Sequence, residues 1–315
     1  MPGYIIMDAP ESKTLRFIVS RPGARLDSYL AEVLPQFSRA YLQKLIGQGH
    51  VLVNGQVVKA SRRLFADDSI TVGLPPLPAP PAAEPASLHI VYEDEEVIVV
   101  DKPAGLTVHP APWHPDHTLV NALLAHCPAL SESGELARPG IVHRLDKNTS
   151  GLIVIAKNEA AHAALSDQFK SQTVTKGYLV LVKGKVFPRE GVVELPLGRD
   201  PRNRKRMAVV ERGREAVTRY RVERYFGDYS LLEVVPGTGR THQIRVHLSA
   251  VGYPVVGDST YGVKSDYLPR QFIHAHRLGF RLPSTRRYLE FSSPLPQELR
   301  QVLEKLLIEG RCGVV

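Results

Sequence analysis

Apolar and polar positions alternate along the first quarter of this chain with the spacings of short helices and strands. Residues 26–34 carry apolar side chains at helical spacing, and residues 42–46 repeat that spacing. Short apolar runs then flank Asn54-Gly55, a dipeptide that favours the positive φ angles of a tight hairpin. Residues 70–72 add a further strand. The pattern predicts a small α+β unit of two helices followed by a hairpin.

A larger set of patterns begins near residue 88. Continuous apolar runs predict buried strands at 97–100, 152–155, 176–182 and 230–235. Helical spacing predicts helices at 119–127 and 159–171, after Gln243, and at 299–307. Thr149-Ser150-Gly151 has the composition of a turn. The strands and helices by themselves support an α+β fold class.

These patterns divide the chain into four segments. Residues 1–14 carry no pattern, and we expect a mobile tail. Residues 15–74 form the small unit, and residues 88–315 form the large one. Proline is dense in residues 75–87, which predicts an extended, semi-rigid linker between them.

Charge narrows the class of partner. Lys and Arg number 40 against 32 Asp and Glu, which gives a net charge of +8 and favours a polyanion. No apolar run reaches the length of a membrane span, and the N-terminus lacks the pattern of a signal peptide. We therefore expect a cytoplasmic protein without a membrane partner. Cys127 and Cys312 lack metal or redox spacing.

Candidate chemistry gathers where a strand is predicted to begin. Arg144 and Asp146 lie between Val142 and the apolar run 152–155, on a bend held by a rigid scaffold. An Arg beside an Asp in a turn is usually a surface ion pair of little energetic value. Local chemistry alone therefore leaves both interpretations open.

The wider motif resembles the RluA-type pseudouridine synthase family. The resemblance rests on His143-Arg144-Leu145-Asp146 followed by Thr149-Ser150-Gly151, on Asp101-Lys102-Pro103-Ala104-Gly105, and on Gly239-Arg240-Thr241-His242-Gln243-Ile244-Arg245. It implies a large mixed, mostly antiparallel sheet with helices packed around it. It is strongest to the D-type synthases of the large ribosomal subunit.

The resemblance also implies an activity, the conversion of uridine to pseudouridine in RNA. Asp146 would be the catalytic residue, attacking the substrate covalently or assisting cleavage of the glycosidic bond. Arg245 would pair with Asp146 and favour its charged form, with Arg240 as the alternative partner. Tyr178 would stack on the uracil or transfer a proton. Because the base must be flipped out of its helix, Arg144 would fill the space that it leaves.

Residues 15–72 resemble the S4-type RNA-binding domain, through Arg25-Leu26-Asp27 and Gly49-His50-Val51-Leu52-Val53-Asn54-Gly55. Arg39, Lys44 and His50 would contact the RNA backbone there. In the large unit the arginine-rich run 199–206, which includes Arg204, Lys205 and Arg206, has the character of an exposed loop. We expect it, with His143 and Arg240, to contact RNA, although such charge runs are usually only solvated.

Other classes of site are less well supported. The histidines between residues 109 and 126 have irregular spacing, and prolines break any helix that could align them, so zinc is not expected. The Gly-x-Gly at 237–239 lacks the rest of a nucleotide-binding motif. We expect no cofactor and a monomer acting on large-subunit ribosomal RNA or a pre-ribosomal particle. Three alternatives remain: a non-catalytic RNA-binding or ribosome-assembly protein, a metal-dependent RNA hydrolase and a synthase acting on transfer RNA.

Overall fold

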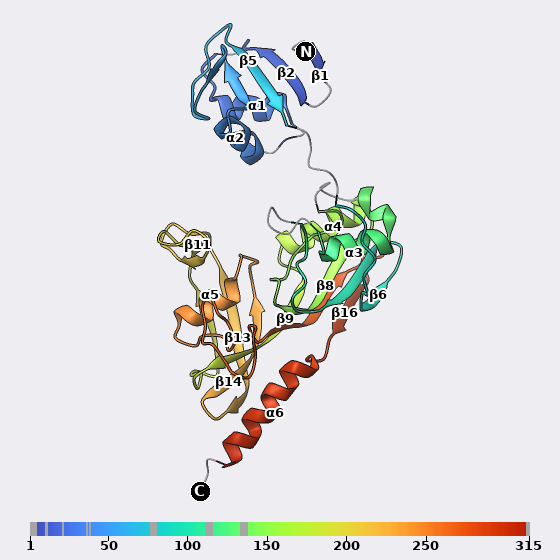
Figure 1. Cartoon of the computed structure of the whole chain (residues 1–315), viewed down its shortest axis with the longest axis vertical. Helices are drawn as coiled ribbons and strands as arrows, with labels where there is room; N and C mark the ends of the chain where they lie inside the picture. Colours follow the sequence, from blue (N-terminus) through green and yellow to red (C-terminus); the bar gives the residue numbers. More distant parts are fainter. Residues whose placement is uncertain are drawn as a thin grey trace. The chain divides into compact units, whose positions relative to one another are not determined.

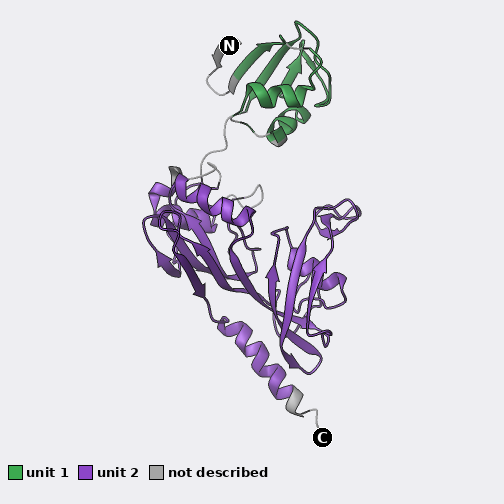
Figure 2. Ribbon diagram, turned by 180° about the vertical axis from the view of Figure 1, so that it is seen from behind, with its two compact units in different colours: residues 1–79 green, residues 80–315 purple. Residues whose placement is uncertain are grey.

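The computed structural model, drawn in Figure 1, describes residues 5–9, 12–20, 22–35, 37, 39–75, 81–110, 116–132 and 138–312. The chain divides into two compact units, residues 1–79 and 80–315, which Figure 2 colours separately. Each unit is described by itself below. Among the described residues, no helix combines the length and the apolar character needed to cross a membrane.

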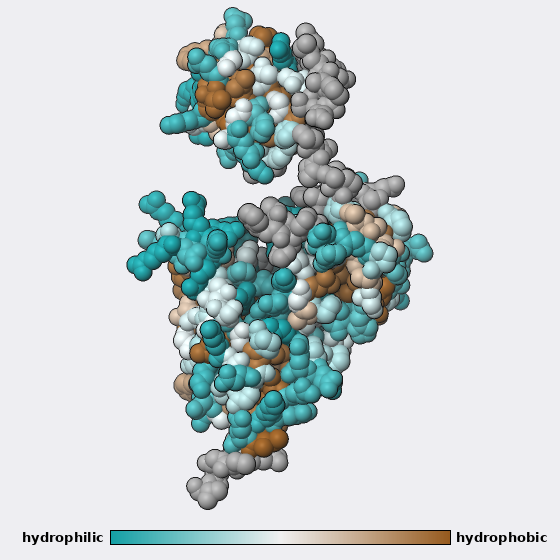
Figure 3. Space-filling view, in the orientation of Figure 1, coloured by the Kyte–Doolittle hydropathy of each residue, from teal (hydrophilic) through white to brown (hydrophobic). Residues whose placement is uncertain are grey.

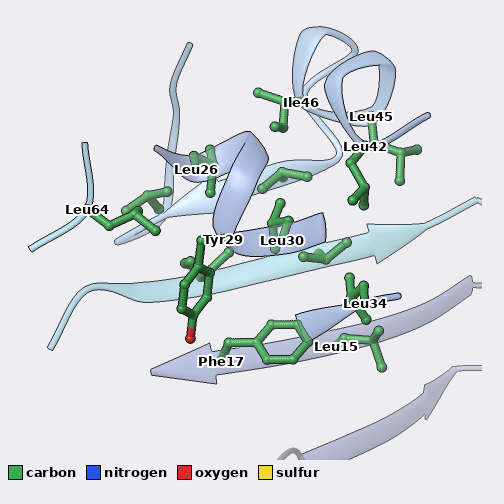
Figure 4. Packing of buried hydrophobic residues seen from close by; sticks show 14 of the residues in the cluster. Leu15, Phe17, Leu26, Tyr29, Leu30, Leu34, Leu42, Leu45, Ile46 and Leu64 are labelled. Carbon is green, nitrogen blue, oxygen red and sulfur yellow. The ribbon is translucent and has the colours of Figure 1, made fainter. Parts of the chain in front are cut away.

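The first unit is an antiparallel five-stranded sheet covered by two helices. The strand order is β1-β2-β5-β3-β4. The elements are β1 (Ile5–Ala9), β2 (Ser12–Ile18), α1 (Leu26–Val33), α2 (Arg39–Gly47), β3 (Val51–Val53), β4 (Gln56–Val57) and β5 (Ser69–Leu74). Figure 4 shows side chains of α1, α2 and the sheet meeting in one apolar core, among them Leu15, Leu30 and Leu42. Asn54 and Gly55 adopt positive φ between β3 and β4, as the hairpin turn requires.

The first strands differ from the sequence prediction. Residues 5–9 and 12–14 belong to β1 and β2, where a patternless tail was expected. Leu15, Phe17 and Val19 alternate inward along and just beyond β2, whereas Ile18 is exposed. This period of two extends the sheet, and β1 pairs with the free edge of β2. These residues form strands because they pair with neighbouring strands, β1 with β2 and β2 with β5. The local sequence pattern does not reveal this pairing.

The second unit is built on a nine-stranded sheet. Its order is β10-β13-β14-β9-β15-β8-β7-β6, with β16 pairing to β15. The strands are β6 (Ile90–Glu93), β7 (Val97–Lys102), β8 (Ser150–Ala156), β9 (Thr175–Lys183), β10 (Glu190–Glu194), β13 (Val217–Phe226), β14 (Tyr229–Pro236), β15 (Ile273–Arg281) and β16 (Tyr288–Ser292). Among these strand pairs, β8 with β15 is parallel and the others are antiparallel. The mixed, mostly antiparallel α+β fold is confirmed.

Apolar side chains on both faces of this sheet explain the continuous apolar runs in its central strands. On one face Ile98 and Val100 of β7 pack with α3 (Leu119–His126). On the other face Val97 and Val99 pack with α4 (Glu159–Lys170). At the other end of the sheet, α5 (Gln243–Ala250) packs against β9 and β14. The C-terminal α6 (Gln297–Cys312) packs mainly through Leu299, Val302 and Leu306.

The predicted turn at 149–151 is wrong for its last two residues, which open β8. Ser150 pairs with His274 and Gly151 with Ala275 of β15. A Cβ on Gly151, whose φ is +114°, would lie 2.3 Å from the carbonyl oxygen of Ala275. At the start of β8 its backbone therefore approaches that of β15 too closely for a side chain, so Gly151 serves the strand pairing rather than a turn. This close approach depends on a strand distant in sequence, which the composition of residues 149–151 does not reveal.

Part of the proline-rich segment packs on the second unit. Residues 76–80 lie outside the described residues. Beyond them, the backbone N–H of Glu84 donates to the carbonyl of Asn121 at 3.0 Å, and the Asn121 amide donates to the carbonyl of Ala82 at 2.8 Å. Residues 82–84 are thus fastened to α3, although the whole of 75–87 was expected to be a spacer.

Candidate active site

Asp146 and Arg245 form an ion pair inside a pocket. The Nη1 of Arg245 donates to Oδ2 of Asp146 at 2.9 Å. Asp146 comes from the loop before β8 and Arg245 from the first turn of α5, two segments separated by 99 residues in the chain. The pocket, here called the active-site pocket, is lined by residues of four segments: Arg144, Leu145, Asp146, Thr149, Tyr178, Pro236, Thr238–Arg245 and Ile273.

Asp258 holds the other side of the Arg245 guanidinium. Its two carboxylate oxygens accept from Nε at 2.6 Å and from Nη2 at 2.9 Å. Asp258 is fully buried, and the Arg245 side chain is 9% exposed. Burial acts to lower the pKa of Arg245, but the carboxylates of Asp258 and then Asp146 raise it above its ordinary value. Arg245 therefore stays charged and fixed in direction.

Asp258 has no role in the predictions made from the sequence. It lies 13 residues after Arg245, beyond the end of α5, and that position carries no local spacing signal. The observation that could have found it is general: a buried arginine needs more than one partner.

A buried lysine supports the loop that carries Asp146. The Nζ of Lys102, at the end of β7, donates to the carbonyls of Pro103, Leu106 and Lys147 at 2.8, 2.9 and 3.2 Å. Burial lowers the pKa of Lys102 to about 7, and the charge of Arg270 acts in the same direction. The turn after β7 is thereby tied to the residue that follows Asp146.

Tyr178 lies in β9, two positions in the sheet from β8, with β15 between them. Its side chain lines the active-site pocket with Asp146. Burial first, and then the negative charge of Asp146, raises the pKa of the phenol. The hydroxyl therefore remains protonated at neutral pH and is available as a hydrogen-bond donor.

His242 lines this side of the pocket, and Tyr261, which is not among the lining residues, contacts it; neither residue was assigned a role from the sequence. His242 precedes α5 with a left-handed φ of +56°, and its Nε2 lies 4.0 Å from Oδ1 of Asp146. Its Nδ1 lies 2.9 Å from the hydroxyl of Tyr261. Two guanidinium groups lie over the ring of Tyr261. The distance from Cζ to the ring centroid is 5.0 Å for Arg206 and 5.1 Å for Arg245.

The predicted RNA contacts around the pocket have different surroundings. Arg144 is exposed and lines the pocket. Arg240 is half-buried at the rim, where its Nε donates to the carbonyl of Glu215 at 3.0 Å. The ring of His143 instead stacks on that of Phe169, with 4.3 Å between the ring centroids. Its Nε2 accepts a hydrogen bond from the backbone N–H of Val154 at 3.0 Å. Burial lowers the pKa of His143 to about 3, so the ring is neutral, and the half-buried side chain also lines the groove described next.

A second groove adjoins the active-site pocket and shares Arg144, Tyr178 and Arg240 with it. Further cations lie along this groove, namely Lys170, Lys176 and Arg214. Asp and Glu are absent from its described lining. An RNA strand leaving the pocket would meet positive charge here.

The arginine-rich run joins two short strands, β11 (Leu197–Arg199) and β12 (Met207–Val209). Figure 3 shows hydrophilic side chains gathered at this end of the second unit. Arg204 and Lys205 are exposed, whereas Arg206 is half-buried against Tyr261. The loop is therefore largely exposed, as predicted, whereas the guanidinium of Arg206 packs over the ring of Tyr261.

In the first unit, Arg39, Lys44 and His50 are exposed on α2 and directly after it. Arg39 and Arg25 both bond the carboxylate of Asp27, which is fully buried. The hydrogen bond from Arg25 lowers the pKa of Asp27, and those from Gln43 and Arg39 add to the effect against the opposing influence of burial. The two guanidinium groups are thus held in place, although each arginine side chain is about half exposed.

Within the described ranges, no three or more His, Cys, Asp or Glu side chains are grouped so as to hold a metal ion. His114, one of the histidines considered for zinc from the sequence, lies outside those ranges. The pocket brings together carboxylate, guanidinium, phenol and imidazole groups. This donor set suits acid–base or covalent chemistry on an organic substrate.

Comparison with known proteins agrees with this chemistry. Residues 96–250 match the RNA pseudouridylate synthase family, and residues 24–70 match the S4 domain. An uncharacterized RNA pseudouridine synthase of Chloroflexus aurantiacus is 52% identical over 307 residues, covering 96% of each chain. The ribosomal large subunit pseudouridine synthase D of Zymomonas mobilis is 42% identical, covering 92% of this chain and 96% of its own.

A solved structure is similar as well. The human RNA pseudouridylate synthase domain containing 1 superposes with a TM-score of 0.55 at 31% identity. The superposition covers 71% of this chain and 97% of the human one. The resemblance drawn from the sequence motifs is confirmed.

Proposed function

Because the chain belongs to the RNA pseudouridine synthase family, we propose that it isomerises uridines of large-subunit ribosomal RNA with Asp146 as the catalytic residue. The observation that carries this proposal is the Asp146–Arg245 pair of 2.9 Å inside a pocket that Tyr178 also lines. RNA is the partner of both matched domains. The family match favours an isomerase over a metal-dependent RNA hydrolase and over a purely binding protein.

The reaction moves the uracil from a nitrogen to a carbon linkage. The N1–C1′ bond breaks with its electron pair left on the uracil, the ring turns, and C5 bonds to C1′. The hydrogen of C5 leaves as a proton, and N1 takes up a proton, so that the product is an isomer of the substrate. Asp146 acts at the ribose side of this bond, held in place by Arg245.

The remaining pocket groups act on the base and on the RNA strand. The target nucleotide leaves its helix to enter the pocket, and the exposed Arg144 fills the vacated stack. Tyr178, whose phenol stays protonated, stacks on the uracil and donates a hydrogen bond. Arg240 and the exposed Arg204 and Lys205 contact phosphates without reading sequence.

The choice of substrate is supported by the relatives and by the tandem of domains. Relatives 42–43% identical over nine-tenths of this chain carry the name ribosomal large subunit pseudouridine synthase D. They align over most of the chain, from the S4 region through the synthase domain. The first unit then holds the RNA through Arg39, Lys44 and His50 while the second modifies it.

The test is tritium release from RNA labelled at C5 of uracil. Wild type, Asp146→Asn and a matched control, Asp228→Asn in the exposed turn between β13 and β14, are compared on large-subunit ribosomal RNA and on transfer RNA. We expect release from ribosomal RNA by wild type and by the control. Asp146→Asn should bind RNA normally and lose more than about 10³-fold in rate, the scale of losing a nucleophile or base.

Each arm tests a different part of the proposal. Turnover retained by Asp146→Asn contradicts the role of that carboxylate. Release from transfer RNA alone contradicts the ribosomal substrate and leaves the reaction intact. Isomerisation is the activity of the family. The RNA from which wild type releases more tritium is therefore identified as the substrate.

A further inference from the structure

The hydrogen bonds around Tyr261 indicate which nitrogen of His242 carries the proton. The backbone N–H of Met207 donates to the hydroxyl oxygen of Tyr261 at 2.8 Å. A backbone N–H can only donate, so this oxygen accepts. The single proton of the hydroxyl then points to the Nδ1 of His242, the acceptor that the described part of the chain places 2.9 Å away.

His242 is therefore neutral with its proton on Nε2. Burial lowers the pKa of the imidazole; the charge of Asp146 opposes this effect, and that of Arg245 adds to it. Since the ordinary value is about 6.5, the ring is uncharged at neutral pH. An imidazole that accepts at Nδ1 and is neutral carries its hydrogen on Nε2.

Among the described residues, no protein acceptor lies within hydrogen-bonding distance of this Nε2–H, and His242 lines the active-site pocket. Oδ1 of Asp146 is 4.0 Å away, which is too far for a hydrogen bond. Because Nε2 of His242 and Oδ1 of Asp146 are 4.0 Å apart, one atom can lie about 3 Å from both of them. This is the distance at which a reacting atom contacts its catalytic groups. Both residues line the pocket, so a substrate atom can contact the carboxylate and the N–H together.

We propose that His242 is a further catalytic residue, whose Nε2–H donates a hydrogen bond to the uracil carbonyl oxygen adjacent to the glycosidic bond. This inference rests on the proposed function. The acceptor is the uracil oxygen nearest to C1′, because Asp146 acts at the ribose end of the same bond. The charge that this oxygen gains when N1 leaves C1′ strengthens the hydrogen bond in the transition state.

The covalent structure of uracil makes one donor sufficient for both halves of the reaction. A half-turn of the ring about the axis through N3 and C6 interchanges N1 with C5 and, at the same time, O2 with O4. The donor that meets O2 while the N1–C1′ bond breaks therefore meets O4 while the C5–C1′ bond forms. A fixed hydrogen-bond donor serves departure and return without moving.

Tyr261 is a positioning residue in this scheme. Its hydroxyl keeps the Nδ1 of His242 an acceptor and so keeps the proton on the side of the substrate. Its own place is fixed, because its backbone N–H donates to Asp258 at 3.1 Å and its carbonyl accepts from Ser249 at 2.7 Å. Asp258 thus holds Arg245 and also orients Tyr261, which in turn orients His242.

The experiment compares His242→Gln with His242→Met. The two residues are unbranched and similar in size, and they share any cost of the left-handed backbone at this position. Gln keeps an N–H donor and Met does not. Single-turnover tritium release from large-subunit ribosomal RNA labelled at C5 of uracil is measured with enzyme in excess, together with the Kd for that RNA.

We expect His242→Met to lose about 100-fold in rate with Kd within twofold, as when one oxyanion donor is removed. His242→Gln should stay within tenfold of wild type. Equal rates for the two variants, or a Met variant that binds RNA weakly but reacts at the wild-type rate when saturated, overturn the role of His242. Wild type and Asp146→Asn in the same series report on the proposed function separately.

Tyr261→Phe provides the second test, one that leaves His242 in place. The variant keeps the ring beneath the guanidinium groups of Arg206 and Arg245 and loses the hydroxyl that sets the tautomer. We expect a roughly tenfold slower single-turnover rate, the size of a modest hydrogen-bond contribution, with unchanged RNA affinity. A wild-type rate in this variant overturns the role of Tyr261 in setting the tautomer.

Discussion

At the residue scale, the site depends on how the five N–H groups of one arginine are divided. Asp258 takes up Nε and Nη2 of Arg245 in a fork, which leaves Nη1 to bond Asp146. A guanidinium held in this bidentate way is fixed in both position and plane. The direction of the charge presented to Asp146 is therefore set by a residue outside the lining of the pocket.

Asp258→Asn should therefore destabilise the second unit as well as slow the reaction. Removing one partner of a buried ion pair costs about 3 kcal/mol or more, because the remaining charge stays buried. The measurement is urea denaturation followed by circular dichroism. Glu290→Gln is the matched control: its partner Arg277 is 45% exposed, and such pairs are worth less than about 1 kcal/mol. Equal losses in the two variants would contradict this role of Asp258.

At the element scale, the catalytic loop is held by elements on either side of it. Lys102 at the end of β7 bonds the carbonyl of Lys147. Arg270, before β15, donates to the carbonyl of Asn148 at 3.1 Å and pairs with Glu298 of α6 at 2.6 Å. The segment between Asp146 and β8 is thus fastened to a turn, a strand and the C-terminal helix, which explains how a loop can present a fixed carboxylate.

Gly151→Ala should disrupt this arrangement at the parallel pairing of β8 with β15. The substitution combines a left-handed φ of +114° with a Cβ placed 2.3 Å from the carbonyl oxygen of Ala275. We expect a loss of at least about 2 kcal/mol in the free energy of unfolding and a lower rate of tritium release. Gly239→Ala is the comparison for stability, because no heavy atom lies within 4 Å of its added Cβ. A Gly151→Ala protein as stable as that comparison would refute the close approach.

At the scale of the whole molecule, two units with separate cores carry separate tasks. Among the described residues, the core of the first unit draws only on residues 15–74, and the active-site pocket draws only on the second unit. Each unit buries its own apolar residues, so neither core depends on the other. RNA affinity is then shared between two linked sites, and each raises the effective concentration of RNA at the other.

Removal of residues 1–79 should consequently weaken RNA binding without unfolding the remainder. We expect the Kd for large-subunit ribosomal RNA to rise at least tenfold at moderate salt and to depend less steeply on salt, since phosphate contacts are lost. Binding is measured across a salt series, and circular dichroism verifies the fold of the truncated protein. A Kd and salt dependence equal to those of the full chain would show that the first unit does not bind this RNA.

The sequence by itself determined the fold class, the main helices and strands and the family, because these follow from local spacing and from contiguous motifs. The pairing of Asp146 with Arg245 was expected through the family resemblance that the motifs carry, not from their spacing. Only the tertiary structure decided that β1 and β2 extend the first sheet and that β8 begins within the expected turn. It also brought Asp258, His242 and Tyr261 to the site. These features depend on partners distant in sequence, and the strength of a buried charge or the tautomer of a histidine is set by what the fold places beside it.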